Sequence, residues 1–184
     1  LKNFGSESTD SISLTAGRDV VVNYLIEGAG MGAISLTATS GKVDLNQNII
    51  SAGGVVTLTA GTDIDMDVAA KVATSTTRTG EDGSVVMTAG GDILLSLIQT
   101  DGQVNLTSTG QIKNQLTTGL NVDAANGGGT AVRSGGLVQL GGVLRFEDGG
   151  DTHAARRADV RRALGILQLM SSSPVGPEWV IIRG

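Results

Sequence analysis

The sequence predicts an all-β fold, a parallel β-helix or solenoid, and three observations carry this prediction. One short motif recurs along the chain, each copy alternates apolar with small polar residues, and glycine-containing corners separate the copies. Of the 184 residues, 28 are glycine and only 2% are aromatic, so the core must be built from Val, Ile, Leu and Ala. A core of such small side chains suits thin, regularly stacked layers.

A five-residue motif close to Ile/Val-x-Leu-Thr-Ala recurs along the first part of the chain. Its central residues lie 22, 22, 29 and 19 residues apart, and they are Leu14, Leu36, Leu58, Met87 and Leu106. We therefore predict one coil for about every 22 residues. The polar insert at residues 74–83 accounts for the long spacing, and we predict that it is a surface excursion rather than a strand.

Each copy is predicted to be a short strand with one buried face, because alternation of apolar and polar residues is the period of a strand. In a solenoid, each position of one coil lies about 4.8 Å from the same position of the next. The five central residues then form one buried column, and the threonines after them form an outward column. An antiparallel sandwich or barrel is the alternative, but it does not require one motif to recur at one phase.

Two further apolar runs follow each copy and complete a coil of three short strands. Residues 63–66 are an example of the second run, and residues 48–50 of the third. A small residue ends each motif at what we expect to be an inward corner, and a glycine follows. We expect positive φ at these glycines, because only glycine adopts it at low cost. They are Gly17, Gly41, Gly61, Gly90 and Gly110.

The phrases at residues 58–64 (Leu-Thr-Ala-Gly-Thr-Asp-Ile) and 87–93 (Met-Thr-Ala-Gly-Gly-Asp-Ile) resemble the repeats of filamentous haemagglutinin-like exoproteins. The resemblance covers roughly residues 10–116. It implies a right-handed β-helix that is exported by two-partner secretion or as an autotransporter passenger. It also implies a secreted or cell-surface location in a Gram-negative bacterium, with a receptor or glycan of a host or neighbouring cell as partner.

The chain divides into residues 1–150, the β-helix, and residues 151–184, a tail. Within the β-helix, residues 10–116 form the regular coils, and the Gly-rich residues 117–150 form irregular ones. Residues 1–150 carry 8 basic and 15 acidic side chains, whereas residues 151–184 carry 5 and 3. The two parts therefore have different roles. Because the chain starts at Leu1 without a signal-like segment, we expect an internal or processed fragment.

The tail is predicted to hold a short helix over residues 152–170, followed by a β-prone run at residues 177–183. Because the last coil of a solenoid exposes apolar residues and strand edges, we expect the tail to cap that end or to contact another subunit. The apolar residues expected to make this contact are Val160, Leu164, Leu167, Trp179 and Ile181.

Arginines on the same helix raise the alternative of a nucleic-acid or anionic-lipid site. They are Arg156, Arg157, Arg161 and Arg162. The net charge of the chain is −5, and few aromatic residues are present to stack on bases, so we expect no nucleic-acid partner. No stretch reaches the roughly 20 apolar residues that cross a bilayer, so we expect no membrane insertion.

The sequence offers little for catalysis, because it has no cysteine and His153 is its only histidine. We therefore expect a protein that is not an enzyme and that carries no cofactor. Asp63, Asp65 and Asp67 alternate on one strand and should project outward about 7 Å apart. They are candidate calcium ligands or the acid and base of a polysaccharide-acting enzyme, and the alternative is a solvated face.

The sequence favours a structural segment of a secreted adhesin, a rigid rod that displays binding surfaces. The alternative is a subunit of an extracellular filament that self-associates through its solenoid ends. An ice-binding solenoid is a minor alternative besides the polysaccharide-acting one, because Thr57 and Thr59 form a Thr-x-Thr pair. Only this one coil has the full pair, and stacking of like side chains explains the threonines without a ligand.

Overall fold

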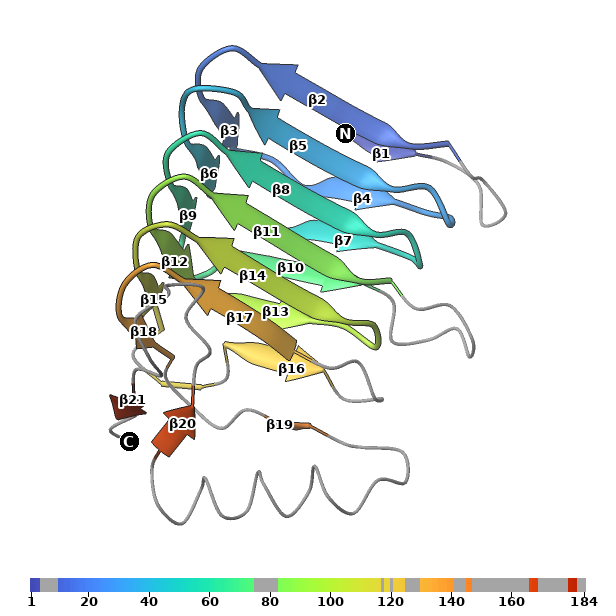
Figure 1. Ribbon diagram of the computed structural model, residues 1–184. Helices are drawn as coiled ribbons and strands as arrows, with labels where there is room; N and C mark the ends of the chain where they lie inside the picture. Colours follow the sequence, from blue (N-terminus) through green and yellow to red (C-terminus); the bar gives the residue numbers. More distant parts are fainter. Residues whose placement is uncertain are drawn as a thin grey trace.

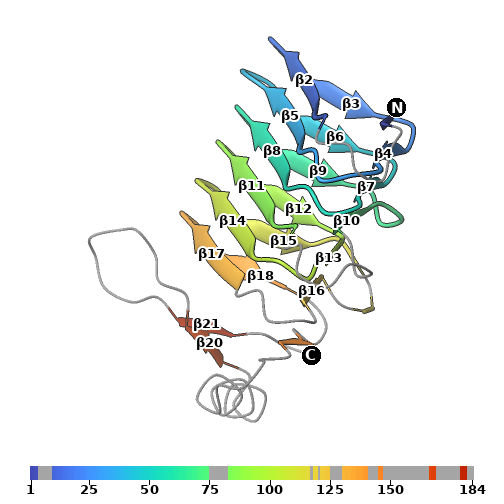
Figure 2. The same cartoon turned by 90° about the vertical axis from the view of Figure 1, so that its right-hand side faces the viewer.

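The computed structural model of the protein is a parallel β-solenoid in which three sheets wind around one core (Figure 1). It describes residues 1–3, 10–74, 83–116, 118–119, 121–124, 130–140, 145–146, 166–168 and 179–181. Figure 2 shows the same stack turned by 90°, with successive coils lying one below the other from the blue to the orange end. The predicted all-β solenoid is confirmed, and no helix occurs in the residues just given.

The first sheet holds the recurring motif, with six strands that pair in parallel. They are β2 (Ile12–Ala16), β5 (Ile34–Ala38), β8 (Val56–Ala60), β11 (Val85–Ala89), β14 (Val104–Ser108) and β17 (Thr130–Ser134). The register aligns the five central motif residues as the spacing predicted. β17 continues it with Val132 beside Leu106, which the sequence analysis missed.

The second and third sheets complete each coil with shorter strands. The second sheet consists of β3 (Val20–Val22), β6 (Val43–Leu45), β9 (Ile64–Met66), β12 (Ile93–Leu95), β15 (Ile112–Asn114) and β18 (Val138–Gln139). The third consists of β1 (Lys2–Asn3), β4 (Ile26–Gly28), β7 (Ile49–Ser51), β10 (Lys71–Thr74), β13 (Leu97–Gln99), β16 (Val122–Ala124) and β19 (Arg145–Phe146). We number the coils from the first (β2, β3, β4) to the sixth (β17, β18, β19), so that β1 lies one level before the first coil.

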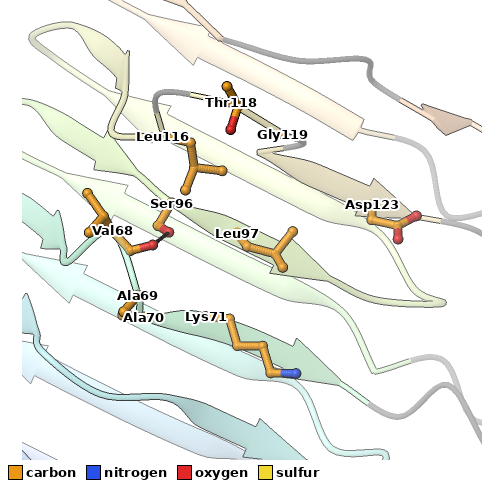
Figure 3. Close-up of a pocket in the computed structure, with 10 residues that line it drawn as sticks. All are labelled: Val68, Ala69, Ala70, Lys71, Ser96, Leu97, Leu116, Thr118, Gly119 and Asp123. Carbon is orange, nitrogen blue, oxygen red and sulfur yellow. Dashed lines mark hydrogen bonds between the residues drawn. The ribbon is translucent and has the colours of Figure 1, made fainter.

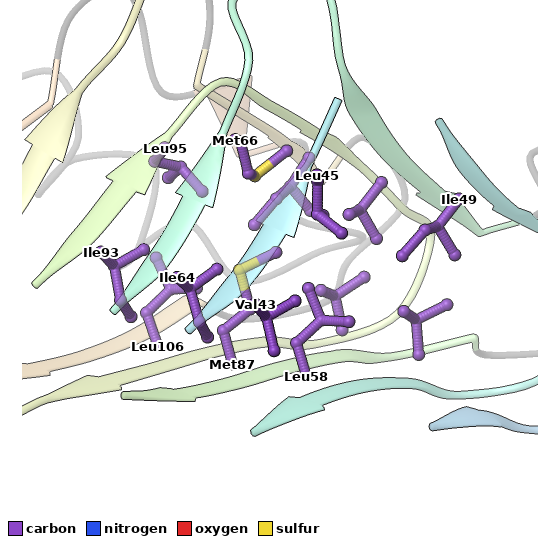
Figure 4. Close-up of a cluster of buried hydrophobic side chains, with 14 of the residues drawn as sticks. Val43, Leu45, Ile49, Leu58, Ile64, Met66, Met87, Ile93, Leu95 and Leu106 are labelled. Carbon is purple, nitrogen blue, oxygen red and sulfur yellow. The ribbon is translucent and has the colours of Figure 1, made fainter. Parts of the chain in front are cut away.

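The core is a continuous column of buried aliphatic and methionine side chains from all three sheets (Figure 4). Leu36, Leu58, Met87 and Leu106 are 0% exposed, in agreement with the predicted buried column. Leu14 was wrongly placed in that buried column, because its side chain is 39% exposed although its register is right. The cause is position: β2 is an edge strand, and no described strand pairs with it on the side away from β5.

The corner glycines have a different role from the predicted one. Among the described residues, only Gly119 has a positive φ. Gly61 and Gly90 therefore form their corners with negative φ, contrary to the prediction. They are needed instead because the backbone of the preceding coil lies against them. A Cβ atom would lie 2.5 Å from the Thr39 carbonyl oxygen at Gly61 and 2.2 Å from the Gly61 carbonyl oxygen at Gly90.

The ends of the predicted surface excursion belong to the core of the stack. Thr74 is the last residue of β10 and only 2% exposed, so its assignment to the excursion was wrong. Its hydroxyl oxygen lies 2.6 Å from that of Thr100, so one hydroxyl donates to the other, and the remaining hydroxyl proton is donated to the Gly83 carbonyl, which both hydroxyls contact (2.6 Å from Thr74 Oγ1). The excursion proper, residues 75–82, lies outside the described residues.

The tail differs from the prediction where it can be compared. Ile166–Gln168, expected in the last turns of a helix, form strand β20, which pairs antiparallel with β21 (Trp179–Ile181). The pairing of the β-prone run with this segment explains the difference, because a strand needs a partner that periodicity within one segment does not show. The rest of the predicted helix lies outside the described residues.

Candidate functional site

A carboxylate ladder links the corners between the first and second sheets. The Asp19 Oδ1 atom accepts the Lys42 backbone N–H (2.9 Å), and Asp63 Oδ1 accepts that of Asp92 (2.7 Å). Asp92 Oδ1 in turn accepts the Gln111 N–H (2.8 Å). Each aspartate therefore caps a donor of the following coil, a contact that the sequence analysis did not predict.

The ladder explains a second set of glycines, which precede the capped residues. A Cβ atom at Gly41, Gly91 or Gly110 would lie 2.2 Å from the Oδ1 atom of the aspartate in the preceding coil. The coil after Lys42 has Thr62 at this position instead of glycine. A side chain fits there because Lys42 has no carboxylate that would lie against it. An aspartate at this corner of one coil thus requires a glycine in the next.

The outer face of the second sheet carries an acidic group around Asp44 and Asp65, which are register partners. Partial burial, followed by the charge of Asp44, raises the pKa of the Asp65 carboxyl group. Lys42 Nζ forms an ion pair with Asp44 Oδ2 at 2.7 Å, and this hydrogen bond raises the pKa of Lys42. The Lys42 ammonium therefore offsets part of the repulsion between the Asp44 and Asp65 carboxylates on this partly solvated face.

Asp63, Asp65 and Asp67 alternate outward as predicted but do not converge. Asp63 is bound to the Asp92 N–H, and Asp67 Oδ1 accepts the Ala69 N–H at 2.8 Å. Within the residues that the structure describes, no three acidic or histidine side chains gather closely enough to hold a metal ion. The geometry therefore does not favour the calcium site for these residues.

A cleft of about 500 Å³ opens at the corner between the second and third sheets (Figure 3). In the fourth coil this corner is a single residue, Ser96, whereas residues 67–70 form it in the third coil and residues 115–121 in the fifth. The fourth coil therefore recedes between its neighbours. Ser96 donates to the Val68 carbonyl (3.1 Å), and Asn121 donates to the Ser96 carbonyl (2.9 Å), which fixes the floor.

The cleft has mainly apolar walls with charged groups at its rim. Its lining is Val68, Ala69, Ala70, Lys71, Ser96, Leu97, Leu116, Thr118, Gly119 and Asp123. The Asp123 Oδ1 atom is buried without a hydrogen-bond partner. Sequence reasoning missed this cleft, although the direct succession of two apolar runs around Ser96 was a signal for it.

The residues predicted for capping or assembly are only partly placed. Val160, Leu164, His153 and the four helix arginines lie outside the described residues. Leu167 is in β20, and Trp179 and Ile181 are in β21. Cα atoms of β21 come within 8 Å of Cα atoms of β18, so the backbone of this segment approaches the sixth coil.

At the end of the stack where the described residues start, the third sheet has one strand more than the other two. It has seven strands because β1 pairs with β4, whereas no described strand pairs with β2 or β3 on that side. The Leu1 backbone nitrogen donates to the Leu25 carbonyl (2.9 Å), and Glu27 N–H donates to the Leu1 carbonyl (2.9 Å), which holds β1 in place.

Searches of protein-family models, curated proteins and solved structures found no match to this chain. In the part of the chain that the structure describes, no helix has the length and apolar character to cross a membrane.

Proposed function

We propose that this chain is a structural segment of a secreted bacterial surface adhesin, a right-handed β-helical rod that displays binding surfaces away from the cell. The observation that carries the proposal is the in-register parallel stack. The same motif position pairs from β2 through β14, so each coil adds length along one axis. A solenoid of this kind extends by repetition, which suits a spacer.

Two features of the stack support a role as a stiff element. The central motif residues Leu36, Leu58, Met87 and Leu106 are 0% exposed, and the carboxylates of Asp19, Asp63 and Asp92 bind the neighbouring coil at its corner. Acidic side chains along the second sheet also discourage lateral aggregation through like-charge repulsion. A Gram-negative cell surface as location, and a surface receptor or glycan as partner, belong to this proposal.

Adhesion is tested with the whole chain coupled to beads and exposed to epithelial and bacterial cells in a flow cell. We expect retention of beads that carry the folded chain and none with the unfolded Leu58→Asp variant as control. Equal retention of both would contradict recognition by the rod. The same chain is incubated with acidic polysaccharides, and release of new reducing ends would contradict a non-enzymatic rod.

A self-assembling filament subunit is a second candidate, because the parallel in-register stacking of coils can in principle continue from one molecule to the next. Sedimentation velocity of the full chain over a wide concentration range distinguishes the two functions. A monomer throughout supports the isolated rod, whereas concentration-dependent growth with fibres by negative-stain microscopy supports the filament.

A further inference from the structure

We propose that the cleft between the third and fifth coils is a carbohydrate-binding site that takes one N-acetylated sugar residue. The proposal deepens the adhesin function, because it names the chemical class of the receptor, and it rests on that function for its biological role. Its physical basis is the cleft itself, which lies within the stack and has a neighbouring coil on either side.

The cleft belongs to one level of the stack. In the first and second coils the corner between the second and third sheets has the same length, residues 23–25 and residues 46–48. The fourth coil reduces this corner to Ser96, so it recedes between the longer corners of its two neighbours. The resulting volume of about 500 Å³ lies within the range of small-molecule sites, about 300–1,000 Å³.

Hydrogen bonds within the chain fix the floor and one wall of the cleft. Asn121 is 0% exposed, and its side-chain amide donates to the carbonyls of Leu95 (2.7 Å) and Ser96 (2.9 Å). The Asp67 carboxylate accepts the Ala69 N–H (2.8 Å), which shapes the corner of the third coil. A ligand would therefore bind without much ordering of the protein, as in a pre-formed site.

Two opposite charges lie at the walls of the cleft, Lys71 and Asp123, the charged residues of its described lining. The strand with Leu97 lies between their strands, and the register places their Cα atoms roughly 12 Å apart (Figure 3). Asp123 Oδ1 is buried without a hydrogen-bond partner, so this acceptor requires a donor. The cleft thus offers an acceptor and a donor with an apolar surface between them.

This combination selects an uncharged ligand that has donors, acceptors and an apolar group. The Lys71 ammonium repels a cationic amine, and the Asp123 carboxylate repels an acidic sugar or a phosphate. One sugar hydroxyl can donate to Asp123 Oδ1, and a second sugar oxygen can accept from Lys71. The apolar side chains of Val68, Leu97 and Leu116 suit the methyl group of an acetamido substituent. An N-acetylhexosamine meets all of these requirements.

An extended peptide is also uncharged along its backbone, but it fits the cleft less well. Peptides that bind sheets do so by adding a strand to an exposed edge. The strand on the floor of the cleft, β13, pairs with β10 on one side and with β16 on the other. Its backbone groups are therefore already engaged in the sheet, and the side chains alone face a ligand.

The test is an NMR titration of the isotope-labelled full chain with the methyl β-glycoside of N-acetylglucosamine. We expect saturable shifts of amides in residues 68–71, 96–97 and 118–123. The matching glucoside, which has a hydroxyl group in place of the acetamido group, should bind about fourfold more weakly or worse, because it loses the apolar contact of one methyl group. N-acetyl-leucine amide serves as the peptide control and should cause no saturable shifts.

Two variants test the role of the buried carboxylate. Asp123→Ala removes the acceptor and should weaken binding of the N-acetylglucosaminide about tenfold. Its melting temperature should stay unchanged or rise, because Asp123 Oδ1 has no donor to lose. Gln99→Ala is the matched control: Gln99 is the register partner of Asp123 and does not line the cleft, so this variant should bind as the wild type does.

No shifts on titration, or shifts away from the cleft, would overturn the proposal. Equal binding of the glucoside would overturn the assignment of the acetamido group, and saturable binding of N-acetyl-leucine amide in place of the sugar would assign the cleft to peptides instead. A lower melting temperature for Asp123→Ala would show that its carboxylate stabilises the fold, which contradicts its role as a ligand acceptor.

The site and the adhesin function fail separately. Sugar binding at the cleft without retention of the chain-coated beads on cells supports the site and contradicts the adhesin. Bead retention that is the same for Asp123→Ala and the wild type supports the adhesin and contradicts the cleft as its receptor site.

Discussion

The first and third coils contain the same motif in the same register, and they differ in what covers them. Leu14 and Leu58 occupy one column, yet Leu14 is 39% exposed and Leu58 is 0% exposed. Gly17 has open space where Gly61 meets the backbone of Thr39. The comparison teaches that in a solenoid the energetic role of a residue is set by the coils on either side, and not by its own motif.

The largest expected effect concerns the leucine column, where the same substitution should cost much more stability at Leu58 than at Leu14. Leu58→Asp would place a charge without a partner in the core and should destabilise the fold by more than about 4 kcal/mol. Leu14→Asp leaves its carboxylate in contact with water and should cost under about 2 kcal/mol. Chemical denaturation of both variants measures the difference. Similar losses for the two would contradict the stack as described.

The corner glycines should show the same contrast at a smaller size. Gly90→Ala forces a methyl group against the Gly61 carbonyl oxygen, and we expect a loss of about 1–3 kcal/mol from the backbone shift. Gly17→Ala meets nothing and should change stability by no more than about 0.5 kcal/mol, in the stabilising direction. Thermal unfolding of the two variants provides the measurement, and an equal loss at both sites would show that backbone conformation rather than coil contact selects glycine.

Removal of residues 75–81 should leave the fold intact. It joins Thr74 to Asp82 and Gly83, which recreates the Thr-Asp-Gly sequence of residues 100–102 in the next coil. The hydroxyl contacts of Thr74 are kept, so we expect a change in stability below about 1 kcal/mol. Circular dichroism and denaturation test this. A matched deletion that also removes Thr74 and Gly83 should be clearly destabilising. An identical result for the two deletions would show that the hydroxyl contacts among Thr74, Thr100 and Gly83 do not stabilise the stack.

The smallest effects concern two aspartates with opposite pKa shifts. The Lys113 ammonium, together with the Gln111 N–H, lowers the pKa of Asp92, so its contribution to stability is present above about pH 4 and is lost as the pH falls through the lowered pKa. Burial and Asp44 raise the pKa of Asp65, so its charge opposes folding at neutral pH and this cost disappears as the pH falls through the raised pKa.

At pH 7, Asp92→Asn should therefore lower the melting temperature and Asp65→Asn should raise it. Solvent screening keeps each effect under about 1 kcal/mol. Melting curves between pH 3 and pH 7 check both signs, and a lower melting temperature for Asp65→Asn at neutral pH would contradict its placement on a crowded acidic face.

Prediction from sequence worked where a local pattern repeats. The column through Leu36, Leu58 and Met87 follows from spacing alone, because stacking makes equal positions neighbours. It failed at Thr130–Ser134, where Arg133 replaces the usual threonine and glycines precede the strand, so that only pairing with β14 identifies it. The cleft at Ser96 was missed because it arises from unequal corner lengths in three coils.

The sequence by itself determined the period, the strand phase and the identity of the core, because alternation and repetition are properties of the chain read along its length. The tertiary structure decided which leucine is buried, why each glycine is needed and which aspartate accepts a backbone hydrogen bond. Those properties depend on atoms about one coil away, roughly 4.8 Å across the stack yet some 20 residues along the chain.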